Sequence, residues 1–394
     1  MVQRRGRKKQ EVYTTNNRVK LIRGGKEYFN LLLQLIAAAK KQVHVQVYIF
    51  EEDTTGRMIA DALKEAAQKG VEVHLLVDGY ASSKLKQTFL KEMTDAGVHL
   101  RFFNPLFKGK NFYFGRRMHH KIAVADAEIA LVTGVNITDR YNDMPDHPAW
   151  LDFAVWLEGD AALDLCNICW STWNNYLTPA APADCSKVRT SATFPEEENS
   201  SVSVRRNDWV RRKNEISFTY IDMLRRAEKQ VVILCSYFLP GKQIRRQMSN
   251  ATKRGVKITV ITAGISDIIL AKYAERYLYA WMLRNNVQIY EYQPRILHGK
   301  IAVADSSWLT VGSYNINNLS AYASIELNLN IRQEKLAKET EEMLLTIAEK
   351  ECIPITDEYL RKSDNILVKF GRWSSFQILR FLLYLFTFYF KHQR

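Results

Sequence analysis

The chain has 394 residues, a length that suits two domains of ordinary size or one large pseudo-symmetric unit. Its composition, 47% hydrophobic and 25% charged, predicts a folded protein with a proper core. The formal net charge of +14 points to a polyanionic partner, which could be nucleic acid, an anionic membrane surface or a phosphate-bearing substrate.

The chain begins with a basic run, MVQRRGRKKQEV. No apolar stretch follows these positive charges, so the run does not have the pattern of a signal peptide. We interpret residues 1–16 as a basic tail, either solvated or in contact with an acidic surface.

Two parts of the chain show the same order of predicted elements. The first contains VHVQVYIFE (43–51) and AAQKGVEVHLLVDG (66–79), and the second contains VVILCSYFLP (231–240) and ATKRGVKITVITAG (251–264). Short runs rich in Val and Ile alternate with helical stretches, which is typical of α/β units. Gly70 and Gly255 stand where a helix would end and a strand begin. An internal duplication explains this order most simply.

The composition also indicates where the two units end. Residues 186–208 are poor in hydrophobic residues and rich in Ser, Thr and Glu, which predicts a linker. We therefore expect one domain at 17–185 and a second at 209–355. The remaining segment, 356–394, ends in the aromatic-rich stretch WSSFQILRFLLYLFTFYFKHQR. Its apolar run is about half of the ~20 residues that a membrane span needs, so we expect an amphipathic helix in the membrane interface. A C-terminal core helix is the alternative.

The five cysteines do not suggest a disulfide framework, because their number is odd and their spacing scattered. Cys166 and Cys169 form a C-x-x-C without the second pair that a structural metal site would need. We interpret them as core residues on one helical face, in a protein of a reducing compartment.

One polar pattern is written twice, as HHKIAVAD (119–126) and HGKIAVAD (298–305), and an Asn follows each copy at the same offset. The candidate site residues are His119, Lys121, Asp126 and Asn136 in the first copy and His298, Lys300, Asp305, Ser313 and Asn315 in the second. Both copies are predicted strands, so the His and the Lys, two residues apart, point the same way. Lys supplies charge and Asn an N–H donor for a tetrahedral oxyanion.

A pseudo-twofold axis would bring the two copies together around one phosphate. One imidazole would then attack phosphorus and form a phospho-histidine, while the other would protonate the leaving alcohol and later deprotonate the incoming hydroxyl. This scheme needs no metal and predicts ping-pong kinetics. Each imidazole also needs an orienting acid. We predict that Asp152, downstream of the first copy, and Glu326, downstream of the second, hold the imidazoles.

The two HxKxxxxD motifs, with GSxN after the second, resemble those of the phospholipase D superfamily. Over about residues 17–355 the chain is similar to bacterial cardiolipin synthases, and FFNP (102–105), WLDFAVWLEG (150–159) and YFLP (237–240) also carry the resemblance. The resemblance implies an α/β fold of two pseudo-symmetric phospholipase D-like α-β-α sandwich domains, packed face to face with the active site at their interface.

It further implies a phosphatidyltransferase that makes cardiolipin and glycerol from two phosphatidylglycerols, without cofactors. His119 would be the nucleophile and His298 the general acid and base, while Asp126 and Asp305 would buttress the site. One departure is Thr133-Gly134, where Gly-Ser or Gly-Gly is common, so a hydroxyl donor beside the phosphate is missing there and Gly134 would offer its backbone N–H.

Three alternatives share these residues: a hydrolase that uses water as acceptor, a nuclease of the same superfamily, and an inactive membrane-binding scaffold. Phosphatidylethanolamine could also replace one phosphatidylglycerol. The expected partner is an anionic phospholipid membrane surface rather than nucleic acid. The expected location is the cytoplasmic face of the bacterial inner membrane, with peripheral attachment through the C-terminal segment and the basic surface.

Overall fold

The structure is a computed structural model that describes residues 11–105, 116–174, 185, 193–211, 213–317, 324–363 and 365–391, with 383–391 described by their backbone alone. The first half of the molecule consists of β1 (Asn17–Ile22), α1 (Gly25–Ala38), β2 (Gln42–Val47), α2 (Thr54–Gln68), β3 (Glu72–Asp78), α3 (Gln87–Asp95), β4 (His99–Phe103), β5 (Arg117–Met118), β6 (Lys121–Ala125), β7 (Ile129–Thr133), the short 3-10 turn Asp139–Tyr141, β8 (Ala154–Gly159) and α4 (Asp160–Trp173). Its sheet has the order β1-β8-β7-β6-β2-β3-β4.

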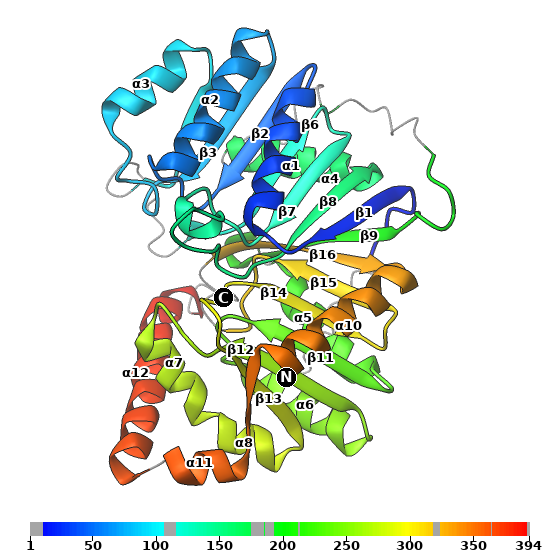
Figure 1. Ribbon diagram of the computed structural model, residues 1–394, viewed down its shortest axis with the longest axis vertical. Helices are drawn as coiled ribbons and strands as arrows, with labels where there is room; N and C mark the ends of the chain where they lie inside the picture. The colour runs from blue at the N-terminus through cyan, green and yellow to red at the C-terminus, as the bar shows by residue number, and fades with distance from the viewer. Residues whose placement is uncertain are drawn as a thin grey trace.

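The second half repeats this plan. It consists of β9 (Ser201–Asp208), the 3-10 turn Trp209–Arg211, β10 (Lys213–Asn214), α5 (Glu215–Arg226), β11 (Gln230–Cys235), α6 (Lys242–Lys253), β12 (Lys257–Ala263), α7 (Ile269–Tyr277), α8 (Tyr279–Arg284), β13 (Val287–Tyr292), β14 (Lys300–Ala304), β15 (Trp308–Gly312), β16 (Ser324–Arg332), α10 (Glu334–Lys350) and β17 (Cys352–Ile355). Its sheet runs β10-β9-β16-β15-β14-β11-β12-β13-β17. The duplicated α/β architecture expected from the sequence is therefore confirmed (Figure 1).

Local sequence explains where several of these elements begin and end. The Asp53 carboxylate caps α2 by accepting a hydrogen bond from the Gly56 N–H at 2.9 Å. Gly70 and Gly255 follow α2 and α6 with φ of +89° and +91°. This backbone conformation is unfavourable for residues other than glycine, because they have a Cβ. The helix ends predicted at these two glycines are confirmed.

The two halves share one hydrophobic core. Phe153, Val155 and Leu165 of the first half belong to the same buried cluster as Leu327 and Leu344 of the second. Two further clusters each lie within a single half. The shared cluster lies between the two sheets, which are stacked one above the other in Figure 1.

Each half also pairs a short segment of its backbone with the other half. Strand β5 of the first half pairs in parallel with the start of β16, in the register Arg117 to Ser324. In the same way Leu151 of the first half forms a parallel bridge with Leu297 of the second. These two backbone pairings between the halves lie directly before the two histidines of the doubled motif. They therefore fix the position of both histidines.

The structure changes the expectations for two segments outside the core elements, the predicted linker and the N-terminal tail. The predicted linker, 186–208, contains β9, whose backbone pairs with β16 from Ser201 to Asp208. The sequence of this strand is largely polar and did not predict it, and the strand forms by pairing with β16 and β10. Residues 186–192 and the basic run 1–10 lie outside the described residues. Glu11–Asn16 pack on the second half, where the Thr14 N–H donates to the Val202 carbonyl at 2.9 Å.

The C-terminal segment forms two helices, α11 (Asp357–Ser363) and α12 (Ile366–Lys391). Helix α12 packs along α7 of the second half, where the rings of Phe376 and Tyr277 lie 4.8 Å apart between centroids (Figure 1). Within the part of the chain that the structure describes, no helix has the length and apolar character needed to cross a bilayer.

The cysteines also differ from expectation. Cys166 and Cys169 are buried on α4, as expected, but Cys166 forms a disulfide with Cys185. This pair could not be predicted from the sequence, because Cys185 lies beyond α4 in a stretch without a recognisable pattern. The disulfide ties the chain after α4 back to that helix.

Candidate active site at the junction of the halves

The backbone places the two motif histidines symmetrically at the junction. The N–H groups of His119 and His120 both donate to the Ile325 carbonyl, at 2.9 and 3.0 Å. The N–H groups of His298 and Gly299 both donate to the Leu151 carbonyl, at 2.7 and 2.9 Å. Each histidine is therefore anchored to the half to which it does not belong.

The two predicted acids lie beside the two histidines, but in crossed pairs. Glu326 of the second half accepts from Nδ1 of His119 at 2.9 Å, and Asp152 of the first half accepts from Nδ1 of His298 at 2.6 Å. Both carboxylates are buried, with 0% and 1% of the side chain exposed. A carboxylate on Nδ1 fixes the ring and leaves Nε2 to react.

The two motif lysines are buried beside the histidines. Lys121 Nζ donates to the main-chain carbonyl of His119 at 2.6 Å. Lys300 Nζ donates to the main-chain carbonyl of His298 and lies 2.8 Å from its Nδ1. Since Nδ1 carries one proton, we assign that proton to the hydrogen bond with Asp152, whose carboxylate can only accept.

Burial and charge shift the pKa values of this cluster. Burial lowers the pKa of His298 to about 4, and the charge of Lys300 lowers it further against the opposing effect of Asp152. Burial also lowers the pKa of His119, while Glu326 opposes and the two lysines reinforce this shift. Both imidazoles are therefore neutral near pH 7 before an anion binds.

The lysines and Asp152 are shifted as well. Burial lowers the pKa of Lys121 to about 7, although Glu326 opposes this, and burial lowers the pKa of Lys300 in the same way. Burial alone would raise the pKa of Asp152, but the charge of Lys300 and the hydrogen bond from His298 hold it below its ordinary value. The cluster thus combines two buried lysines with two buried carboxylates, and an anionic ligand beside the lysines would favour their charged forms.

The position of Ser313 in the second half corresponds to Gly134 in the first. The buried Ser313 hydroxyl donates to Glu326 Oε2 at 2.5 Å, so in this structure it supports the acid that holds His119. A Cβ at Gly134 would lie 2.6 Å from Asp152 Oδ1. The Gly134 N–H faces the Phe153 carbonyl at 3.5 Å. Glycine at this position therefore makes room for the Asp152 carboxylate, which is a different reason from the one the sequence suggested.

The two asparagines differ in their partners. Oδ1 of Asn315 accepts from the Ser236 hydroxyl at 2.8 Å, which leaves its Nδ2 as the donor for a ligand. Asn136 accepts from the Ile49 N–H at 3.0 Å and donates to the Tyr141 hydroxyl at 3.0 Å. Asn136 thus ties together loops of the first half.

The structure does not bring Asp126 and Asp305 to the cluster. Asp126 accepts from the N–H groups of Lys40, Lys41 and Gln42 at 2.8–2.9 Å, where α1 leads into β2. Asp305 accepts from three consecutive N–H groups, those of 228–230, at the matching corner before β11. A catalytic role for the two motif aspartates is therefore not supported, because strands β6 and β14 separate each of them from its histidine.

Aromatic residues that sequence analysis missed surround the histidines. The ring of Tyr48 lies 4.9 Å from that of His119, and the ring of Tyr141 lies 5.1 Å from that of His298. The repeat carries no signal for them, because Tyr48 matches Ser236, and Ile49 matches Tyr237, when the two motif strands are aligned. Tyr237 donates to the Asp267 carboxylate, beside the same centre.

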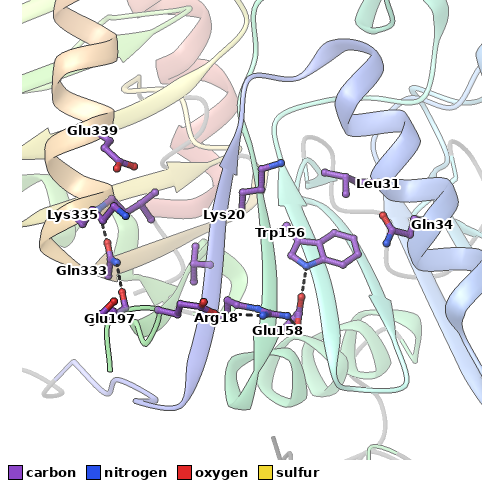
Figure 2. A pocket seen from close by; sticks show the side chains of 13 residues that line it. Arg18, Lys20, Leu31, Gln34, Trp156, Glu158, Glu197, Gln333, Lys335 and Glu339 are labelled. Atoms are coloured by element: carbon purple, nitrogen blue, oxygen red, sulfur yellow. Dashed lines mark hydrogen bonds and ion pairs between the residues drawn. The ribbon is translucent and has the colours of Figure 1, made fainter. Parts of the chain in front are cut away.

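A separate cleft of about 530 Å³ lies away from this centre, between β1, α1, β8 and α10. Figure 2 shows its lining, in which Arg18 pairs with Glu158 and the Trp156 ring nitrogen donates to the same carboxylate. Arg18 also pairs with Glu198 in this cleft, and no motif residue lines it. Among the described residues no group of His, Cys, Asp or Glu side chains is arranged to hold a metal ion.

Comparison with known proteins gives consistent results. A family model described as "Cardiolipin synthase, PLD-like domain" matches residues 32–147 and 220–347. Cardiolipin synthase B of Salmonella typhimurium is 33% identical over 353 residues, which cover 88% of this chain and 84% of that protein. Cardiolipin synthase B of Escherichia coli K12 is 31% identical with the same coverage.

Solved structures resemble the fold at low sequence identity. The crystal structure of phosphatidylserine synthase from Haemophilus influenzae is similar with a TM-score of 0.71 at 14% identity, over 94% of this chain and 97% of that one. A polyphosphate kinase from Porphyromonas gingivalis has a TM-score of 0.57 at 16% identity, over 87% of this chain and 49% of that one.

The paired His-Lys motifs on two stacked α/β units define an enzyme of the phospholipase D class, as the sequence predicted. Within that class, the chain belongs to the cardiolipin synthase family, which makes it a phosphatidyltransferase.

Proposed function

We propose that this protein synthesises cardiolipin by transferring a phosphatidyl group from one phosphatidylglycerol to a hydroxyl of another, with release of glycerol. The observation that carries the proposal is the pair of neutral imidazoles, each held by a carboxylate of the other half, beside two buried lysines. The names of the relatives support the choice of substrate and product.

In the first step, Nε2 of His119 attacks phosphorus, and the bond from phosphorus to the glycerol oxygen breaks. His298, protonated at Nε2, gives that proton to the leaving oxygen. The bound phosphodiester anion favours this protonated form, because an opposite charge raises the pKa of an imidazole. Lys121, Lys300 and Nδ2 of Asn315 hold the non-bridging oxygens, whose charge grows in the transition state.

In the second step, Nε2 of His298 takes the proton from the hydroxyl of the second phosphatidylglycerol. The freed oxygen attacks phosphorus, the bond from phosphorus to Nε2 of His119 breaks, and the neutral imidazole is restored. Glu326 stabilises the positive charge that the phosphorylated ring carries, since the Nδ1 proton of His119 stays in their 2.9 Å hydrogen bond.

We further infer that the protein works while bound peripherally to the cytoplasmic face of a bacterial inner membrane. Its net charge of +14 supports attraction to anionic lipid, at about 1 kcal/mol for each Lys or Arg near the surface. The C-terminal helix α12 supports attachment, because apolar residues are exposed along it, among them Leu367 at 79% and Phe370 at 63%.

The test is chromatography of lipids after incubation with phosphatidylglycerol vesicles in metal-free buffer. Wild-type protein should give cardiolipin and glycerol, while His119→Ala and His298→Ala should each lose at least about 10²–10⁴-fold in rate. His147→Ala is the matched control, because the His147 side chain is 42% exposed and outside the cluster. Phosphatidic acid as the sole product would establish a hydrolase instead. A phosphorylated peptide containing His119, trapped by acid-free quenching of His298→Ala, would support the assignment of the nucleophile.

A further inference from the structure

Helix α7 is amphipathic, but it turns its charged face toward the protein interior and apolar residues toward the outside. Its charged residues Lys272 and Glu275 are buried, with 7% and 2% exposed, whereas Ile269 and Tyr273 are 72% and 40% exposed. Residues four apart share one face of a helix, so Ile269, Tyr273 and Tyr277 lie on one face. Helix α12 covers part of this face at Tyr273 and Tyr277, and Ile269 stays 72% exposed. A helix on the surface of a water-soluble domain normally turns its apolar face inward.

A network of buried ion pairs fixes α7 in this orientation. Lys272 Nζ lies 2.7 Å from Glu275 Oε1 and 2.8 Å from Glu291 Oε1. Arg276 binds Glu291 with two hydrogen bonds, of 2.9 and 2.7 Å. Rotation of the helix to hide its apolar face would leave Glu291 of β13 buried without its partners Lys272 and Arg276.

Helix α12 extends the apolar surface of α7. The two helices lie side by side (Figure 1), in contact through Phe376 and Tyr277. On α12, Leu367, Phe370 and Phe381 are 79%, 63% and 61% exposed. Loop 264–268 leads into α7. We call the exposed apolar residues of this loop, of α7 and of α12 the α7–α12 face.

The charge of α12 indicates what covers this face. Residues 366–391 contain no Asp or Glu, and Lys369 and Arg380 are exposed cations of this helix, whereas Arg372 is buried. A helix that carries exposed apolar residues and cations but no carboxylate is typical of an anionic lipid interface, and the one acid of loop 264–268, Asp267, accepts a hydrogen bond from Tyr237. A symmetric contact with a second copy would instead bring Lys369 and Arg380 against their own equivalents, without acids to balance them.

The α7–α12 face also continues to the rim of the catalytic centre. Ile265 and Ile268, each 49% exposed, flank Asp267, which accepts a hydrogen bond from Tyr237. Next to Tyr237, the Phe238 N–H donates to Glu275 of α7 at 2.9 Å. On its other side, Ser236 donates to Asn315 of the centre. One short segment, 236–238, therefore connects the face to the site.

We propose that the α7–α12 face seats the protein on an anionic phospholipid bilayer, with loop 264–268 at the headgroups and the catalytic centre open to lipid. The proposal rests on the proposed function for the identity of the substrate, and it adds α7 and its loop to the membrane contact. The ion pairs beneath α7 hold its apolar residues outward in the absence of lipid. Lipid substrate then reaches the histidines past loop 264–268.

The test is flotation of the full chain with vesicles of equal phosphatidylglycerol and phosphatidylcholine, compared with pure phosphatidylcholine. Ile269→Ser and Phe370→Ser should each lower partitioning into the mixed vesicles by roughly tenfold, as expected for the loss of one buried apolar side chain. Phe218→Ser is the matched control, since Phe218 is 57% exposed on α5 and should leave binding unchanged. Wild-type binding should also be weaker to pure phosphatidylcholine.

Two results would overturn the docking proposal: wild-type vesicle binding by both α7–α12 variants, or a loss of self-association in these variants with vesicle binding unchanged. Activity on detergent-dispersed phosphatidylglycerol separates this proposal from the proposed function. There the docking variants should keep wild-type activity, while His119→Ala should bind vesicles normally and lack activity. Vesicle binding without synthesis by the wild type would contradict the proposed reaction and leave the docking proposal standing.

Discussion

At the scale of single residues, Lys121 has a charge that depends on pH within the physiological range. Its ammonium group is buried, and burial lowers its pKa to about 7 despite the opposing effect of Glu326. A bound phosphodiester anion would raise this pKa again, so binding of the substrate and of the proton are linked.

This linkage predicts how KM depends on pH. Below pH 7 Lys121 is protonated with or without substrate, so its contribution to KM is constant. Above pH 7 the free enzyme loses the proton and binding must restore it, so KM should rise up to about tenfold per pH unit. Lys121→Arg should flatten this rise, because a guanidinium stays protonated. Steady-state kinetics from pH 6 to 9 measure the effect, and an equal rise in the Arg variant would contradict it.

Much of the site could be predicted at this scale, because identity and spacing carry the information. The doubled motif indicated both histidines and both lysines, and the structure brings them together. The crossed pairing of His119 with Glu326 could not be predicted, since it depends on how β5 docks on β16. The buried role of the Ser313 hydroxyl was also hidden, because it depends on the neighbouring carboxylate.

At the scale of elements, three adjacent strands stack their histidines into a ladder. His44 of β2, His74 of β3 and His99 of β4 have ring centroids 4.8 and 5.1 Å apart. The Trp170 ring of α4 contacts the first two rings at 4.6 Å. Burial lowers the pKa of His44 to about 3, and the neighbouring His74 lowers it further. His44 is therefore a neutral ring in this ladder near pH 7.

The ladder predicts a loss of stability in mild acid. The unfolded chain protonates His44 near its ordinary pKa of about 6.5 and the folded chain near 3, so stability falls as pH decreases between these values. The slope contributed by this one residue is about 1.4 kcal/mol per pH unit. His44→Leu should remove that part of the slope in urea unfolding between pH 6.5 and 4.5. His147→Leu, at an exposed position, should leave the slope as in the wild type, and an unchanged slope in His44→Leu would contradict this account.

Elements were predictable where the sequence shows a clear period, as in β2, β3, β11 and β12. Strand β9 was not, because its sequence SVSVRRND is largely polar and its partner β16 lies far along the chain. The sequence also could not predict which face of α7 is buried. Its period indicates two faces, and only the position of Glu291 on β13 determines which of them is buried.

At the scale of the molecule, the shared core makes the two halves depend on each other. Phe153 and Leu327 lie in one buried cluster, and each motif histidine is anchored to the opposite half. Unfolding of one half would expose apolar surface of the other and release its histidine. We therefore expect the described domains to unfold as one cooperative unit, although duplicated chains often unfold in two steps.

The matched corner aspartates allow a direct test of this cooperativity. Asp126→Ala and Asp305→Ala each remove the acceptor for three backbone N–H groups, one in each half, and should each lower the free energy of unfolding by about 1–3 kcal/mol. If the halves unfold together, calorimetry will show a single peak in both variants, shifted to lower temperature by similar amounts. Two peaks, of which Asp126→Ala shifts only the one at lower temperature, would mean that the halves unfold independently. The shared core would then align the two histidines without stabilising the halves against separate unfolding.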